Sequence, residues 1–390
     1  MKKILAIAAQ PIEYNTSSMI RVLALINEMA RQGMNVDLIV AHPNENSIYF
    51  NRDSKIDKRI NITRIGPQKS LAEKVKYLPP DSLKSAMILF VRKLYKYVDL
   101  FGASIELLHY ADKIPDSIIS NQYSHLVSFS SPIVSHILSN RIYSQLKHKP
   151  YYIQQWGDPL STNITDKTII PNIIKRRIEH KILAPADKVV YVSPITALEQ
   201  KRLFKTKQNS IYYIPTPASE VIHADPITIS RRIKLGYYGS YYTVARDIHP
   251  LYAAVKDNSG YELEIIGDSN VKLDSVENVK IKNRVSKDVI NDSIASCQIL
   301  VCLLNRSGGQ IPGKVFSYAR TSKEVLMIID GERGDEIQNY FSKYDRYTFC
   351  HNNVASIANS LSEYLKNNIS PRKPLDDFSP QNVLNEMMSK

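Results

Sequence analysis

Short apolar runs alternate with amphipathic segments along most of the chain. Residues 3–9 form an apolar run typical of a strand that is buried on both faces of a parallel sheet. After a polar loop, apolar side chains recur at helical spacing from Ile20 to Ala30, and Gly33 then ends the segment, as glycine commonly does after a helix. Residues 36–40 form the next apolar run. The pattern predicts a strand–helix–strand unit within about 40 residues.

The alternation continues to residue 214, pauses, and starts again. Further strands are predicted at 126–129, 151–154, 188–192 and 211–214, with helices at 132–145, 171–184 and 194–204. Residues 215–219 contain two prolines within three residues, which favours an extended linker. The second series has predicted strands at 233–238, 261–266, 279–281, 299–303 and 325–329, and helices at 248–257, 288–296, 312–321, 353–367 and 379–389.

Two successive series of this kind predict an α/β protein with two doubly wound Rossmann-like domains facing a central cleft. We expect the first domain at residues 1–215 and the second at 220–372. Residues 373–390 are expected to form a C-terminal helix that packs back on the first domain. In such folds, ligands bind beyond the carboxyl ends of the strands.

Length and composition narrow the class of protein. A chain of 390 residues with 43% hydrophobic composition can bury a large core without a disulfide or metal staple. The three cysteines form no metal-binding or disulfide pattern, which favours a reducing compartment. The first residues imitate a signal peptide, but their apolar core is shorter than the roughly 7–15 residues of a secretory signal. We therefore expect a first β-strand there.

The charge is concentrated in the first half of the chain. The net charge is +13, and residues 1–220 carry 30 basic and 18 acidic side chains. Such a field attracts an anionic membrane, a nucleic acid or an anionic substrate, although an excess of lysine also serves solubility alone. Residues 73–110 interleave aromatic and aliphatic side chains with lysine and arginine, which is typical of a membrane-interface segment. The alternative is an ordinary helix packed on its domain.

Two turns in the second half carry candidate anion-binding residues. Gly239 and Ser240 follow a predicted strand, and a turn without a Cβ lets a phosphate approach the backbone amides. Arg246, six residues after Ser240, can supply a forked and permanently charged donor. Gly313 and Lys314 stand at the start of a predicted helix, where free amides and a full charge favour an anion. A plain turn and a surface helix would also explain these residues.

Together these segments resemble a GT-B glycosyltransferase, and the second half is similar to glycosyltransferase family 4. The order of Tyr238, Gly239, Ser240 and Arg246 resembles the strand, Tyr-x-Gly-Ser turn and basic residue of that family. Lys314-Val315-Phe316-Ser317-Tyr318 closely resembles its K-[LV]-F-E-Y segment. In the first half, Ser130-Ser131-Pro132 and Gln155-Trp156-Gly157-Asp158-Pro159 are similar to the "SSPP…DxxDPW" of one branch. The resemblance covers essentially the whole chain.

The resemblance implies that the second domain binds a nucleotide sugar and the first domain binds the acceptor. The residues that would hold the donor are Gly239, Ser240, Arg246, Arg284, Val285, Gly313, Lys314 and Ser317. Of these, Arg284 and Val285 would lie near the base, and Ser317 near the ribose. The family has two glutamates eight residues apart, which here would fall at Gly309 and Ser317. Both are missing, and this departure leaves room for a degenerate, inactive copy.

Candidate acceptor and catalytic residues lie in the first half. Asp158 follows a strand end and precedes Pro159, so it is the candidate acid/base group, with a turn cap as its alternative role. The candidate acceptor-binding residues are Glu13, Asn15, Thr16, Ser17, Ser18 and Trp156. Trp156, the single tryptophan, would stack on a sugar ring or belong to the core.

The function expected from the resemblance is transfer of a sugar, of hexose type, from a nucleotide diphosphate donor to a hydroxyl of a growing glycan, free or lipid-linked, in bacterial surface polysaccharide assembly. We expect no cofactor and no metal, because arginine and lysine can stabilise the leaving diphosphate. The expected place is cytoplasmic, peripheral to the inner face of the plasma membrane. The alternatives are a GT-B nucleotide-sugar epimerase, a degenerate GT-B binding protein, and a basic nucleic-acid-binding protein. No known nucleic-acid-binding motif supports the last of these.

Overall fold

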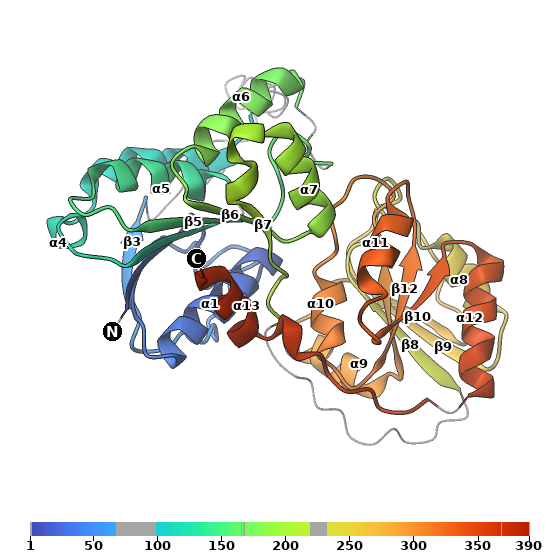
Figure 1. The fold of residues 1–390 in the computed structure, drawn as a ribbon. Helices are drawn as coiled ribbons and strands as arrows, with labels where there is room; N and C mark the ends of the chain where they lie inside the picture. Colours follow the sequence, from blue (N-terminus) through green and yellow to red (C-terminus); the bar gives the residue numbers. More distant parts are fainter. Residues whose placement is uncertain are drawn as a thin grey trace, which may run out of the picture. The chain divides into compact units, whose positions relative to one another are not determined.

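The computed structural model describes residues 2–67, 99–130, 132–164, 166, 168–218, 232–367 and 369–389 (Figure 1). Residues 73–98 of the basic aromatic stretch, and Ser131, lie outside the described residues. The chain divides into two compact units. The first comprises Met1–Ile214 with Leu384–Lys390, and the second comprises Pro215–Val383.

The first unit contains a sheet of seven parallel strands in the order β3-β2-β1-β4-β5-β6-β7. Its strands are β1 (Lys3–Ala8), β2 (Asn35–Ala41), β3 (Asn61–Ile65), β4 (His125–Phe129), β5 (Tyr151–Trp156), β6 (Lys188–Tyr191) and β7 (Ile211–Tyr213). The apolar runs of β1, β2 and β4 are buried, as strands covered by helices on both faces must be. The chain adds β2 and β3 on one side of β1 and then crosses to the other side, where it adds β4 to β7.

Helices flank this sheet (Figure 1). They are α1 (Ser17–Arg31), the 3-10 helix η1 (Gly102–Lys113), α4 (Asp116–Ile119), α5 (Val134–Gln145), α6 (Asn172–Leu183), α7 (Pro194–Leu203) and η2 (Lys205–Ser210). The C-terminal residues of α13 (Pro380–Met388) also belong to this unit. The buried Lys188 of β6 fixes them, because its Nζ donates to the carbonyl oxygens of Glu386 at 2.9 Å and Ser389 at 2.8 Å.

The second unit contains six parallel strands in the order β10-β9-β8-β11-β12-β13. They are β8 (Ile233–Tyr238), β9 (Tyr261–Ile266), β10 (Val279–Lys282), β11 (Ile299–Leu303), β12 (Glu324–Ile329) and β13 (Tyr347–His351). The helices are α8 (His249–Lys256), α9 (Lys287–Ser296), α10 (Lys314–Ala319), α11 (Gly334–Phe341), α12 (Val354–Lys366), the 3-10 helix η3 (Asp376–Phe378) and the start of α13. Here the chain reverses direction between β8 and β11. The expected fold class, two doubly wound Rossmann-like units, is confirmed.

Some elements differ from the expectation. The sequence pattern did not predict β3, α11 or β13. The segment expected as a linker is buried at 215–218 and joins the second unit, where the Ala218 amide donates to the carbonyl of Phe378 at 2.8 Å. The helix expected at 312–321 is shorter and spans Lys314–Ala319. Within the described ranges, no helix is both long and apolar enough to span a bilayer.

Candidate functional site

The strands β8 and β11 separate at their carboxyl ends. β11 pairs with β8 only through Ile299 opposite Leu235 and Leu300 opposite Gly236, whereas it pairs with β12 along all five of its residues. The order of the strands also changes direction between these two, because β9 and β10 lie on one side of β8 and β11 to β13 lie on the other. A crevice at such a switch point is where open parallel sheets bind ligands. The loops that follow β8 and β11 therefore form the candidate site of the second unit.

The turn after β8 packs closely against the end of β9. The Gly239 amide donates to the carbonyl of Ile266 at 2.9 Å, and a Cβ on Gly267 would lie 2.0 Å from the Gly239 carbonyl oxygen. Gly267 must therefore be a glycine for this approach. A Cβ on Gly239 would meet only the Tyr237 hydroxyl, at an ordinary contact distance of 3.9 Å, and both Gly239 and Ser240 are half-buried.

Arg246 is fixed by backbone and amide oxygens rather than by a carboxylate. Its Nε donates to Asn305 Oδ1 at 2.9 Å, and its Nη1 donates to the Ser240 carbonyl at 3.1 Å. Asn305 is buried two residues after the end of β11, and its Nδ2 donates to the Gln310 carbonyl at 2.9 Å. Asn305 therefore joins Arg246 to the glycine-containing loop before α10. Sequence reasoning had missed it, because an asparagine after a strand carries no signal by itself.

Lys314 adds a second positive charge near the same strand end. It is half-buried, its Nζ lies 5.6 Å from the ring centre of Tyr318, and burial lowers its pKa. Burial raises the pKa of the Cys302 thiol in β11 to about 12, and the charges of Lys314 and Arg246 both oppose that rise. Both cations therefore lie near Cys302. Among the described residues, neither Arg246 nor Lys314 forms an ion pair with a carboxylate.

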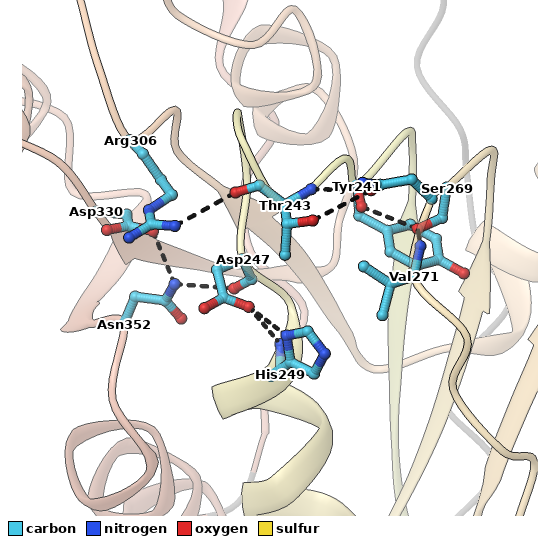
Figure 2. A network of polar contacts seen from close by, with 10 residues as sticks. Tyr241, Thr243, Asp247, His249, Ser269, Val271, Arg306, Asp330 and Asn352 are labelled. Atoms are coloured by element: carbon cyan, nitrogen blue, oxygen red, sulfur yellow. Dashed lines mark hydrogen bonds and ion pairs between the residues drawn. The ribbon is translucent and has the colours of Figure 1, made fainter.

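A network of polar contacts holds the loop between β8 and α8 (Figure 2). Arg306, after β11, donates from Nη1 to the Thr243 carbonyl at 3.3 Å. The side-chain amide of Asn352, the residue after β13, donates to the Asp247 carbonyl at 2.9 Å and to Asp330 Oδ2 at 2.8 Å. Figure 2 shows these residues, which follow four different strands, gathered around one loop. The loop that carries Arg246 is therefore held from several sides before any ligand binds.

Arg284 and Val285 lie in the loop after β10. The Arg284 guanidinium forms an ion pair with Asp268, with Nε 2.9 Å from Oδ2, which joins the ends of β10 and β9. Val285 is half-buried. The charge of Arg284 is thus balanced within the protein, in contrast to the charges of Arg246 and Lys314. Within the described residues, no three histidine, cysteine or acidic side chains gather in a metal-binding arrangement.

The residues at the two missing glutamate positions differ in exposure. Ser317 is half-buried on α10, and its hydroxyl contacts the carbonyls of Gly313 and Lys314, each at a weak 3.4 Å. Gly309 is buried. Gly313 is the exposed residue before α10. Ser317 therefore presents a hydroxyl that only weak contacts within its own helix occupy.

A buried arginine fixes α10 from behind. The Arg346 guanidinium is almost completely buried and donates to the carbonyls of Tyr318, Ala319, Thr321 and Lys323. These carbonyls lie at and just after the end of α10, where a helix leaves acceptors unsatisfied. Arg346 thereby determines where the helix that carries Lys314 ends. No local sequence pattern marks this role.

In the first unit, the polar loop after β1 is mostly used for internal contacts. Glu13 forms an ion pair with Arg64 of β3. Thr16 caps α1 by accepting a hydrogen bond from the Met19 amide, and both Thr16 and Ser18 donate to Gln10 Oε1. The Asn15 amide donates to the Tyr49 carbonyl, and Ser17 is exposed. The structure thus assigns Glu13, Thr16 and Ser18 local structural contacts.

Asp158 lies after β5 and near Arg21 of α1. Asp158 is half-buried, and no hydrogen bond or ion pair joins it to another described residue. Burial raises its pKa, and the charge of Arg21 opposes the rise. Arg21 Nη2 lies 3.6 Å from the position that a Cβ of Gly157 would take, and the Gly157 amide donates to Ser130 Oγ at 3.0 Å. A carboxylate of raised pKa can accept a proton from a hydroxyl. Sequence reasoning had missed Arg21, a single charge within an otherwise apolar helical pattern.

Trp156 is a core residue, so of the two roles expected for it the core role is confirmed and stacking on a sugar is excluded. Its side chain has 0% exposure. The indole ring stacks on the His136 imidazole with centroids 4.4 Å apart, and its Nε1 donates to Gln154 Oε1 at 3.0 Å. A ring that is covered on its faces by protein cannot contact a substrate.

No protein-family profile and no curated protein matches the sequence. Three solved structures show what the fold resembles. Sucrose-phosphate synthase from Thermosynechococcus elongatus has a TM-score of 0.60 at 12% identity over 100% of this chain and 95% of its own. A variant of S. aureus TarM in complex with fondaparinux, α-GlcNAc-glycerol and UDP has a TM-score of 0.59 at 12% identity, over 99% and 95%. A Listeria monocytogenes protein described as a UDP-N-acetylglucosamine 2-epimerase has a TM-score of 0.53 at 10% identity, over 100% and 95%.

These likenesses extend over nearly the whole of each chain. At identities near one in ten they establish the fold. The chain has the GT-B fold of two Rossmann-like units.

Proposed function

We propose that this chain is a glycosyltransferase that moves a sugar from a nucleotide diphosphate sugar to a hydroxyl of a growing glycan in bacterial surface polysaccharide assembly. The observation that carries the proposal is the pair of cations, Arg246 and Lys314, beside the separated ends of β8 and β11. A pair of positive charges with no carboxylate partner among the described residues favours a ligand with more than one negative charge, such as a diphosphate.

The donor would bind in the second unit. Arg246 and Lys314 would contact the diphosphate, and the turn at Gly239 and Ser240 would let it approach the backbone. The remaining expected donor residues are Arg284, Val285, Gly313 and Ser317. The S. aureus TarM structure, which contains UDP, supports a uridine nucleotide as the first donor to try.

In the reaction, the bond between the sugar and the diphosphate breaks and a new glycosidic bond forms to the acceptor oxygen. Negative charge then builds on the leaving diphosphate, and Arg246 and Lys314 would stabilise it without a metal ion. The acceptor hydroxyl must lose its proton, and we assign Asp158 as the base that accepts it. Arg21 would keep this carboxylate ionised at the working pH despite its burial. In this proposal, the first unit binds the acceptor through the loop after β1, where Ser17 is exposed and Asn15 is half-buried.

We further propose that the acceptor is lipid-linked and that the protein works at the inner face of the plasma membrane. The support is the charge of the first half, where residues 1–220 carry 30 basic and 18 acidic side chains. Such a surface is attracted to anionic lipids.

A ligand screen tests the proposal. Thermal-shift measurements with UDP, GDP, dTDP and CMP sugars should show one nucleotide class that raises the melting temperature, because a ligand that binds only the native state stabilises it. The product of the best donor then separates the candidates. An altered sugar formed without any acceptor would indicate the epimerase alternative, and binding of no nucleotide by the folded protein would contradict the proposal.

A further inference from the structure

Large aliphatic side chains are exposed on helix α6 and in the segment just before it. Ile169 is 74% exposed, Ile173 is 62% exposed and Ile174 is 44% exposed. Ile173 and Ile174 occupy the first turn of α6, which lies on the periphery of the first unit (Figure 1). Single exposed aliphatic residues are common, but here three of them fall within six positions of the sequence.

The charges exposed on α6 are all positive. Arg176, Arg177 and Lys181 are exposed. The one acidic residue of the helix, Glu179, is fully buried and accepts hydrogen bonds from the amides of Leu160 and Ser161.

The buried lysine of the helix is also used internally. Lys175 pairs with Asp166 at 2.5 Å. The sequence therefore places its inward-facing charges in satisfied contacts and leaves an outward face with only cations.

The apolar and basic residues share one face of the helix. Ile173, Arg177 and Lys181 are spaced four residues apart, so they lie one above the other, and Arg176 is three residues after Ile173. Ile173 and Ile174 thus lie in the first turn of α6, and the basic residues follow one turn further along. We call the residues Ile169, Ile173, Ile174, Arg176 and Arg177 the α6 surface.

We propose that the α6 surface docks on an anionic lipid bilayer, with the isoleucines entering the headgroup and acyl boundary and the arginines contacting lipid phosphates. Aliphatic side chains flanked by cations are the composition that such an interface favours. A nucleic acid would match the arginines but offers no apolar phase for three isoleucines. The inference specifies which surface would meet the membrane in the proposed function, and it can be tested without any sugar transfer.

Vesicle flotation tests the proposal with the full chain. The wild type should bind vesicles of phosphatidylcholine with about 30 mol% phosphatidylglycerol at about 0.1 M salt, and bind pure phosphatidylcholine weakly. Replacing both arginines (Arg176→Gln with Arg177→Gln) should weaken binding by about 25-fold, since each basic residue near an anionic surface contributes about fivefold. Replacing both helix isoleucines (Ile173→Ser with Ile174→Ser) should weaken binding by about tenfold or more.

The matched controls change the same residue types elsewhere on the first unit. Ile48 is 87% exposed, and the side chain of Arg52 is 80% exposed. The variants Ile48→Ser and Arg52→Gln should therefore bind vesicles like the wild type. Circular dichroism and the nucleotide-induced thermal shift should be unchanged in all variants, which separates a failure of this proposal from a failure of the donor-site proposal.

A fluorescent label tests whether the isoleucines of α6 enter the bilayer. The cysteines Cys297, Cys302 and Cys350 are buried, so a single Ile173→Cys variant can be labelled with an environment-sensitive dye. The dye should shift to an apolar spectrum with anionic vesicles, and the same dye at Ile48→Cys should not.

Three outcomes would overturn the proposal. They are vesicle binding that is unchanged in both α6 double variants, absence of wild-type binding to anionic vesicles, and a concentration-dependent dimer that Ile173→Ser with Ile174→Ser abolishes. The last would make the α6 surface an interface between two copies of the chain.

Discussion

Replacing Lys314 with methionine should weaken nucleotide binding and leave the fold at least as stable. Methionine keeps the apolar part of the side chain beside the Tyr318 ring and removes only the charge. In the free protein this charge is half-buried and has no carboxylate partner among the described residues, and burial lowers its pKa. Removing a charge that burial disfavours costs the empty protein nothing. A melting temperature equal to or above that of the wild type is therefore expected.

The loss in the bound state can be estimated from the contact that disappears. A charged hydrogen bond to a phosphate contributes about 1.5–3 kcal/mol, which corresponds to about 10- to 150-fold in the dissociation constant. The same contact predicts a pH dependence. Only protonated Lys314 attracts the diphosphate, so wild-type affinity should fall as the pH rises through its lowered pKa. Lys314→Met should lack this alkaline decline.

Titration calorimetry with the best nucleotide of the screen measures both effects, and Lys366→Met is the matched control. Lys366 ends α12 and pairs with Glu363 at 2.8 Å. The neighbouring Leu365 lies beside Gly260, just before β9, so this end of α12 is at the amino ends of the strands. The control should bind like the wild type. Equal affinity of wild type and Lys314→Met across the pH range would show that Lys314 does not contact the phosphates, and the donor-site assignment would be wrong.

Two further predictions concern Ser317 and the Arg21–Asp158 pair. Ser317→Glu should tighten nucleotide binding by about 1 kcal/mol in calorimetry, because a carboxylate accepts from ribose hydroxyls more strongly than a hydroxyl does. Unchanged or weaker binding would mean that the ribose does not reach this turn of α10. Arg21→Gln should move the acid limb of the pH–rate profile to higher pH, because loss of the cation leaves burial to raise the pKa of Asp158 further. Asp158→Asn should remove that limb and reduce kcat by about 10²–10⁴-fold. An acid limb at the same pH in the wild type, Arg21→Gln and Asp158→Asn would exclude Asp158 as the base.

The central strands were predictable from the sequence, and the missed elements have weak patterns for physical reasons. β1 and β11 are covered on both faces, so nearly every residue in them is apolar. β3 is an edge strand in which only Ile65 is buried, so its sequence shows no such run. α11 packs through Ile337 and Phe341, and two apolar residues are too few to reveal a helical period.

The sequence left two roles open for Trp156, because the strand expected at 151–154 stops two residues before it. β5 runs to Trp156, and in a strand alternate side chains point to the same face. Tyr152 and Gln154 are completely buried, so Trp156 must follow them into the core. The side on which Trp156 lies depends on how far β5 extends, and that length depends on pairing with β4 and β6, which the local sequence does not show.

Some residues of the candidate site could be found from the sequence and others could not. The resemblance led to Arg246 and Lys314, because each belongs to a short motif. The roles of Asn305 and Arg346 depend on partners far along the chain: Asn305 binds Arg246 across 59 positions, and Arg346 binds carbonyls 23 to 28 positions away. A polar residue has no role until the fold brings its partner, so single-sequence reasoning could not assign either one.

The two units differ in how they treat charge, and the difference suits the chemistry proposed for each. At the switch point of the second unit, Arg246 and Lys314 have no described carboxylate partner, while the neighbouring Arg284 is paired with Asp268. At the ends of β4 and β5 in the first unit, the cation Arg21 instead faces the carboxylate Asp158. A diphosphate requires net positive charge, whereas a base requires a carboxylate whose pKa is raised by burial and limited by a cation. Ser317, at the position where the resembled family has a glutamate, adds no negative charge to the first kind of site, which suits a ligand that is itself anionic.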